Sequence, residues 1–282
     1  MRRVLAGVTA GVLGLAAGCS GGDEDPGTDG NVAGEPAVTA EESARVLADW
    51  TRRYNEAVGS GDARVWREAV TGPLAAPVEA RVRTYGRLPG SARVEPRNPV
   101  FYVPRQKGWP RWFAVAALDG GRQVLAVFAR AGAKDRWRAA HWLPFKGRPP
   151  ELAYDSEGYA VPAPDRGVAA AHAAYLGGDD TAPLTPDAFS SDARARRDRF
   201  APGPGPSYAL QTKDGGSLVW YGLTQEQAGG GTPRAELRDY LTRTGRTGGG
   251  VRATWQWLAI GYAPVSGRAN VLGESVSLAA VR

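Results

Sequence analysis

The sequence predicts an α+β protein made of two similar halves, each with helices followed by a curved antiparallel sheet. Apolar residues recur at helical spacing from residue 41 to 86 and then alternate with period two from 98 to 145. The same order, helices and then strands, returns after residue 166. A proline-rich stretch at 149–165 separates the two segments and is interpreted as a linker.

The first half, residues 41–148, carries local signals for its elements. Thr39 and Glu42 have capping-box spacing ahead of the first helix, and Asp62 is placed to cap a second. Pro77 suits the first position of a third helix. Strands are expected at 111–119, 122–131 and 135–145, with a hairpin at Asp119-Gly120-Gly121.

Two of these strands are apolar on both faces. Residues 124–129 read VLAVFA, and 112–118 show the same pattern. In an antiparallel sheet with one solvent-exposed face, apolar and polar residues alternate along each strand. We therefore expect the helices of 41–86 to cover one face and the second half to cover the other, with the 149–165 linker running over the surface.

The second half, residues 166–282, predicts helices at 168–176 and 186–200. Residues 232–244 fit either a helix or a strand. The glycine-rich segments 229–233 and 245–250 lack the Lys-Ser/Thr of a phosphate loop and are interpreted as loops. Strands are expected at 207–212, 217–223, 251–262 and 269–281.

The N-terminus has the pattern of an export signal. Two arginines precede 14 uncharged, largely apolar residues, 4–17, too short for a bilayer span. Ala17 and Gly18 then precede Cys19, the single cysteine of the chain. This resembles the lipobox of bacterial lipoproteins, although Ala16 stands where that family usually has leucine. The resemblance implies a signal peptide at 1–18, cleavage between Gly18 and Cys19, and lipid on Cys19; an ordinary secretory signal is the alternative.

Residues 19–40 are rich in Gly, Asp, Glu and Pro, which predicts a flexible tether. The chain as a whole is similar to uncharacterised lipoproteins of high-GC Gram-positive (actinobacterial) bacteria. Each half also resembles the cone-shaped nuclear-transport-factor-2-like fold, in which a tyrosine helix precedes a Gly-Asp turn; here Tyr54 precedes Gly61-Asp62 and Tyr175 precedes Gly178-Asp179. These resemblances imply a lipid-anchored protein on the outer face of the cytoplasmic membrane and transfer no catalytic residue.

Composition limits the classes of binding partner and cofactor that the chain can be expected to have. From Ala40 onward the chain has 33 basic and 24 acidic residues, a net charge of +9. Attraction to anionic lipid or an anionic envelope polymer is one interpretation; codon bias that enriches Arg together with Ala, Gly and Pro is the other, and we favour it. With one cysteine, disulfides and cysteine metal sites are excluded. We expect no cofactor and no nucleic-acid partner, and leave an envelope polymer or protein partner open.

Candidate catalytic groups are few. His141 is expected to share one face of its strand with Trp137, Ala139, Leu143 and Phe145, so a hydrogen-bonded core histidine is expected, with a base in a pocket as the alternative. His172 is expected on the polar side of its helix, and two distant histidines make no metal site. The aromatic strands are expected to be core rather than a sugar-stacking platform; they contain Trp112, Trp142, Trp220, Trp255 and Trp257.

These observations predict a non-enzymatic binding or scaffold module of the cell envelope, with no catalytic and no metal residues. The alternative is an envelope hydrolase or isomerase with a pocket near His141.

Overall fold

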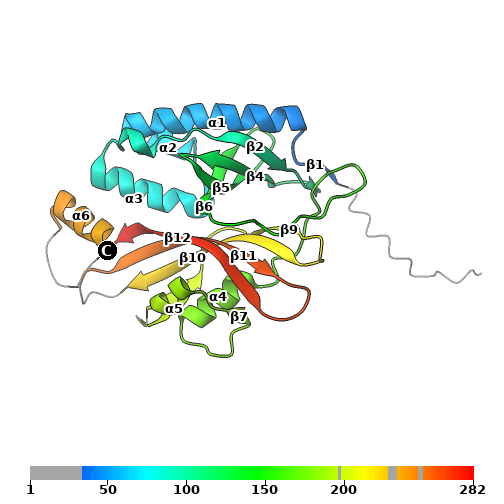
Figure 1. The fold of residues 1–282 in the computed structure, drawn as a ribbon. Helices are drawn as coiled ribbons and strands as arrows, with labels where there is room; N and C mark the ends of the chain where they lie inside the picture. Colours follow the sequence, from blue (N-terminus) through cyan, green and yellow to red (C-terminus); the bar gives the residue numbers. More distant parts are fainter. Residues whose placement is uncertain (1–33, 196–197, 228–233, 247–249) are drawn as a thin grey trace, which may run out of the picture. The chain divides into compact units, whose positions relative to one another are not determined.

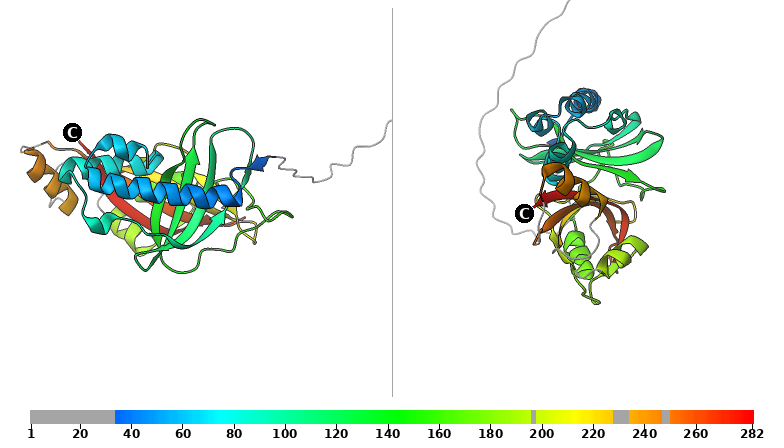
Figure 2. Two further views of the ribbon diagram at one scale, coloured as in Figure 1. Left: turned by 90° about the horizontal axis from the view of Figure 1, so that it is seen from above. Right: turned by 90° about the vertical axis from the view of Figure 1, so that its left-hand side faces the viewer.

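The computed structural model describes residues 34–195, 198–227, 234–246 and 250–282. The expected signal peptide, Cys19 and the tether up to residue 33 lie outside these residues. Helices and antiparallel sheets make up the described chain, so the α+β class is confirmed. Its elements stack as helices, sheet, sheet and helices (Figures 1 and 2).

The first helix begins and ends where the sequence predicts, and the second begins at its expected cap but ends at Arg67 rather than near Val70. Thr39 accepts a hydrogen bond from the Glu42 backbone at 3.1 Å, and Asp62 accepts one from Arg64 at 2.7 Å. Pro77 is the third residue of the third helix rather than its first, because the helix begins at Ala75. The elements are α1 (Ala40–Ser60), α2 (Ala63–Arg67), the 3₁₀ turn η1 (Gly72–Leu74), α3 (Ala75–Tyr85) and the 3₁₀ turn η2 (Gly90–Ala92).

The first sheet has the strand order β2-β4-β5-β6. Gly120 and Gly121 form the predicted two-residue hairpin, and both adopt the positive φ that this turn needs. Its strands are β2 (Arg97–Tyr102), β4 (Arg111–Asp119), β5 (Arg122–Arg130) and β6 (Arg138–Phe145); β1 (Glu35–Pro36) pairs separately with β3 (Arg105–Gln106).

A β-bulge in β6 changes which residues share a face. Val127 pairs with His141 and Phe128 with Ala139, so Ala140 is the extra residue. Ala139 faces the helices, whereas Leu143 faces the second sheet. The expectation that His141 shares a face with Trp137 and Ala139 is therefore wrong, because simple alternation fails at the bulge.

The second sheet has the order β7-β12-β11-β10-β8, and β9 also pairs with β10. The helix expected at 186–200 ends at Arg194, and Phe200 lies in a strand because it pairs with Gln225 and packs on Trp257. Residues 232–244 fit either a helix or a strand in the sequence, and the structure has a helix there from Ala235. The elements are α4 (Val168–Leu176), β7 (Leu184–Thr185), α5 (Ala188–Arg194), β8 (Arg199–Pro202), β9 (Tyr208–Gln211), β10 (Ser217–Gln227), α6 (Ala235–Thr244), β11 (Ala253–Ala263) and β12 (Ala269–Val281).

Both faces of the first sheet are buried, as predicted. One face packs on α1 and α2, around Trp50, Trp66 and Phe128. The other packs on the second sheet through Leu125, Val127, Leu143, Leu218, Trp220 and Ile260. The two halves approach so closely that a Cβ on Gly222 would lie 2.9 Å from Pro73. The expected apolar contact between the halves is confirmed.

The expected linker, residues 149–165, does not simply run over the surface, because parts of it are buried and bonded to the rest of the fold. Leu152 and Ala160 are buried. Ala160 donates a backbone hydrogen bond to Val103, and Val161 accepts one from Gln211, so the segment is bonded to both halves. Ala37 and Val38, expected in the tether, are also buried.

The helix α3 belongs to both halves. It packs on α2 and also on β12 and α6 (Figure 1). The Tyr85 hydroxyl donates to Asp239 of α6 at 2.6 Å, and Arg243 stacks on the Tyr85 ring. The halves also differ in strand number and pairing, so their similarity stays a prediction.

We predict that a fragment of residues 34–148 does not fold as a soluble monomer. Without the second sheet it exposes the apolar face that carries Leu125, Val127 and Leu143. Size-exclusion chromatography with light scattering and thermal unfolding, with residues 34–282 as the control, measures this. A monomeric fragment that unfolds cooperatively contradicts the prediction.

Candidate functional site

The ends of four neighbouring chain segments in the second sheet bring charged side chains together. In the strand register Arg199 lies opposite Glu226, and Glu226 lies opposite Thr254. The backbones of Arg252 and Arg282 exchange two hydrogen bonds of 2.9 Å. Opposite residues, and residues two apart on a strand, share a face. These five side chains therefore lie on one face at the end of the sheet.

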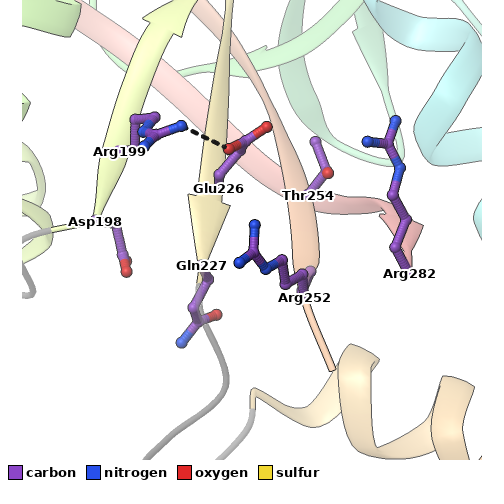
Figure 3. A pocket seen from close by; sticks show the side chains of 8 residues that line it. Asp198, Arg199, Glu226, Gln227, Arg252, Thr254 and Arg282 are labelled. Carbon is purple, nitrogen blue, oxygen red and sulfur yellow. Dashed lines mark ion pairs between the residues drawn. The ribbon is translucent and has the colours of Figure 1, made fainter. Parts of the chain in front are cut away.

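A cavity of about 380 Å³ opens at this place. Figure 3 shows the side chains around it, with the Glu226 carboxylate turned toward Arg199. It is lined by Asp198, Arg199, Glu226, Gln227, Arg252, Ala253, Thr254 and Arg282. We call it the arginine pocket.

The side chains that line the pocket include three arginines and two acids. Arg199 forms an ion pair with Glu226 at 3.5 Å. Asp198 accepts a hydrogen bond from Gln225 at 2.5 Å. Within the described chain, the guanidinium groups of Arg252 and Arg282 form no ion pair or hydrogen bond.

Arg252 and Arg282 are a cross-strand pair of like charge. Such pairs destabilise a sheet, because the two charges repel at short distance. An anion between the two side chains would turn this repulsion into two attractions. Guanidinium groups are suited to carboxylates and phosphates because their donors match the oxygen spacing. The arrangement can therefore hold an anionic group.

The pocket could not be predicted from the sequence. Its arginines lie up to 83 positions apart and contribute only to a general surplus of positive charge there. A partial signal existed in the charged residues that flank the expected strand 251–262, but the strand register is needed to pair Arg252 with Arg282.

His141 lies in the core, as expected, but without the expected hydrogen bond. Its ring is 0% exposed and contacts the Tyr208 ring edge-on. Neither ring nitrogen has a hydrogen-bond partner among the described residues. Burial lowers the pKa of His141 to about 3. A fully buried ring offers a substrate no approach, so this geometry does not support the alternative of a catalytic pocket there.

The expectation that His172 lies on the polar side of its helix is wrong, because the residue is 0% exposed. Its Nδ1 lies 2.9 Å from the Tyr221 hydroxyl and its Nε2 lies 3.0 Å from the Ser190 hydroxyl. The helix α4 is packed between the second sheet and α5, so its polar partners lie inside the protein. Burial lowers the pKa of His172 to about 4.

Glu274 of β12 completes this buried cluster. Its carboxylate lies 3.9 Å from Nε2 of His172. Burial, followed by the negative charge of Asp187 and a hydrogen bond to it, raises the pKa of Glu274 to about 8. Burial opposes ionisation of Asp187 as well, but hydrogen bonds from Ser190 hold the pKa of Asp187 below its ordinary value. Because Glu274 keeps its proton, its neutral carboxyl group can lie beside the ionised carboxylate of Asp187 without charge repulsion.

The cluster is not arranged as a catalytic triad. A triad places a carboxylate on one ring nitrogen and an accessible serine on the other. Here the nitrogens contact Tyr221 and Ser190, and Ser190 is 0% exposed. We interpret the cluster as a structural network that joins α4, α5, β10 and β12.

The remaining sequence candidates are placed as follows. Trp220, Trp255 and Trp257 are buried, as expected for core residues. In the described part of the chain, no group of His, Cys, Asp or Glu is arranged to hold a metal ion. The described helices include none long and apolar enough to span a bilayer. Gly18, Cys19 and the loop expected at 229–233 lie outside the described residues.

A family model described as a domain of unknown function, DUF8094, matches residues 34–195, more than half of the chain. The chain belongs to this family. A relative from Streptomyces coelicolor, uncharacterized lipoprotein SCO2278, is 31% identical over an alignment of 224 residues; the match covers 66% of this chain and 66% of the relative, just under two thirds of its length. A second from the same organism, uncharacterized lipoprotein SCO6871, is 31% identical over an alignment of 277 residues, and the match covers 79% of this chain and 76% of the relative.

The names of these relatives confirm the resemblance to uncharacterised actinobacterial lipoproteins. No solved structure matches the chain. The likeness to the nuclear-transport-factor-2-like fold therefore stays a prediction.

We predict that Glu274→Gln stabilises the protein at alkaline pH. Unfolded Glu274 ionises near 4.5, whereas the folded protein holds its proton to about pH 8. In this window the folded state binds more protons, so the free energy of unfolding falls as pH rises. The loss from pH 6.5 to 8 is about 2 kcal/mol.

Glu274→Gln should remove that loss, since glutamine stays neutral and can still donate to Asp187. Below pH 6.5 the two histidines act in the opposite direction, because their lowered pKa values make stability fall on acidification. Urea unfolding at several pH values, with the exposed Glu95→Gln as control, measures this. Parallel profiles for wild type and Glu274→Gln contradict the prediction.

Proposed function

We propose that the protein is a lipid-anchored binding module of the cell envelope that holds an anionic envelope polymer in the arginine pocket and catalyses no reaction. The anchor is diacylglycerol on Cys19, inserted in the outer face of the cytoplasmic membrane. The observation that carries the binding role is the pair Arg252 and Arg282, whose backbones are hydrogen-bonded to each other and whose guanidinium groups have no ion-pair partner among the described residues.

Two findings support the anchor. Small residues precede Cys19 after an apolar segment of signal-peptide length. Two relatives that match most of this chain are named lipoproteins. Two acyl chains give a stable membrane anchor, whereas one chain binds only marginally.

Two properties of the pocket, and the net charge of the chain, support a polymer ligand rather than a small metabolite. The pocket is open at the end of the sheet, and Arg199, half of an exposed ion pair, lies at its border. Arg252 and Arg282 lie at paired ends of neighbouring strands, and Glu226 separates them from Arg199 (Figure 3). Two adjacent cationic side chains suit neighbouring carboxylates or phosphates of a polymer. The net charge of +9 from Ala40 onward adds a general attraction.

We predict that Cys19→Ala leaves the chain as an unprocessed precursor. Lipid is attached to the cysteine thiol before cleavage, so its loss blocks both steps. Intact mass spectrometry and membrane fractionation of protein produced in an actinobacterial host measure this, with Ser20→Ala as the control. A wild-type mature chain that carries no lipid contradicts the proposed anchor.

We predict that Arg252→Gln raises the stability of the free protein and weakens polyanion binding. Removing the like-charge pair relieves about 0.5 kcal/mol at low salt. Polyphosphate and polyglutamate should raise the melting temperature of wild type, because they bind the folded state, and should do so less for Arg252→Gln. Arg122→Gln removes the same charge from an exposed hairpin at a distance and is the matched control.

Equal polyanion stabilisation of Arg252→Gln and Arg122→Gln would mean that net charge alone attracts the polymer. That outcome contradicts a binding role for the arginine pocket. Thermal shift measurements in phosphate-free buffer, followed by calorimetric titration, distinguish the two results.

A further inference from the structure

The described chain begins beside an exposed loop that carries a tryptophan. Glu35 of β1 pairs with Gln106 of β3, and the next four residues, 107–110, are all exposed. They read Lys-Gly-Trp-Pro. Trp109 is 39% exposed, whereas the other tryptophans of the described chain are buried or half-buried.

Arg111 ties this loop to the start of the described chain. Its guanidinium pairs with Glu35 at 2.8 Å and donates to the Pro36 and Gly108 carbonyl oxygens. It also stacks on the Trp109 ring, with 5.0 Å to the ring centre. The point where the tether enters the fold and the Trp109 loop are therefore one connected structure.

The Trp109 ring is held in place rather than folded inward. Arg130 stacks on the same ring at 4.7 Å, so two guanidinium groups contact it. Both arginine side chains are themselves mostly covered, at 17% and 20% exposure. The two guanidinium groups therefore fix the ring at a place where part of it stays in solvent, and tryptophan is enriched at interfaces where one side is apolar and the other wet.

Other exposed side chains at this end of the first sheet are of the kinds that contact membrane surfaces. Lys107 and Lys134 are exposed and form no ion pair with any described residue. Tyr154 is 49% exposed, and the adjacent Asp155 pairs with Arg105 of β3. Tryptophan and tyrosine concentrate at the headgroup level of membranes, and lysines near the surface are attracted by anionic lipids.

The chain between the anchor and the fold limits where this loop can be. Fifteen residue steps separate Cys19 from Gly34, which allows at most about 50 Å of extended chain. Tethering at that length keeps the attached end of the fold at high effective concentration near the bilayer. Weak contacts that a free protein could not maintain therefore become effective.

We propose that the surface of Lys107, Trp109, Lys134 and Tyr154, the membrane-facing end, docks on the headgroup region of a bilayer that contains anionic phospholipid. The inference rests on the proposed lipid anchor for its setting. The arginine pocket lies at the opposite end of the fold, beside α6 and the C-terminus, whereas β1 marks the membrane-facing end (Figures 1 and 2). Docking therefore directs the arginine pocket away from the membrane, toward the envelope polymer.

The test replaces the lipid with a tag. Residues 20–282, with hexahistidine in place of Cys19, are recruited to vesicles that contain nickel-chelating lipid. Because Cys19 is the single cysteine of the chain, Ala133→Cys, at an exposed position beside Lys134, and Arg238→Cys each provide one labelling site. Arg238 is exposed on α6, at the end away from β1. Each variant is labelled with an environment-sensitive fluorophore and quenched by a lipid that bears a headgroup quencher.

On phosphatidylglycerol vesicles we expect quenching at position 133 to exceed that at position 238 at least twofold. Trp109→Ser should reduce the difference to less than half, and Trp109→Tyr should preserve it. Lys134→Glu, which alters an exposed side chain without a described partner, should reduce the difference on phosphatidylglycerol and leave it unchanged on phosphatidylcholine.

Equal quenching at the two positions, or stronger quenching at 238, overturns the proposal. Insensitivity to both Trp109→Ser and Lys134→Glu overturns it as well, because the orientation would then come from the tether alone. The tag makes this result independent of lipid on Cys19, which is measured by mass spectrometry, and of polyanion binding, which is measured by calorimetry. Failure of either proposed function is thus distinguishable from failure of this one.

Discussion

The fold depends on one constraint: β4 and β5 are apolar on both faces, so neither face of the first sheet can meet water. The helices α1 and α2 cover one face and the second sheet covers the other. The second sheet then has one face committed to this contact and buries the other under α4 and α5. With the faces occupied, the ends of the strands are where polar groups can gather. The arginine pocket lies at one such end and the tether enters at the other.

Features decided by neighbouring residues could be predicted from the sequence. The cap at Thr39 and the Gly120-Gly121 hairpin need no partner from elsewhere in the chain. Features decided by distant pairing could not. The bulge at Ala140 leaves no mark in an apolar run, yet it reverses the faces of β6. Phe200 has a helical neighbourhood in sequence, but strand pairing with β10 and the ring of Trp257 determine its conformation.

The sites follow the same division. Cys19 could be proposed from its flanking residues, whereas the pair Arg252 and Arg282 needs the register of β11 and β12. The segment around His172 reads AAAHAAY and has no polar side to place it on. Its partners come from α5, β10 and β12, so only the packed structure shows that its polar surroundings are internal. The exposure of Trp109 is equally invisible in a sequence with nine tryptophans.

The contact between the two sheets also bears on how this family can evolve. The region shared with the family model stops at residue 195, but β9, β10 and β11, which cover the first sheet, all follow it. A gene fragment that ends at that boundary encodes half of an interface. Recombination between distant members would join sheets whose surfaces no longer interlock, as at Gly222 against Pro73. The two halves are therefore expected to be inherited together and to vary in step, with compensating changes across the sheet interface.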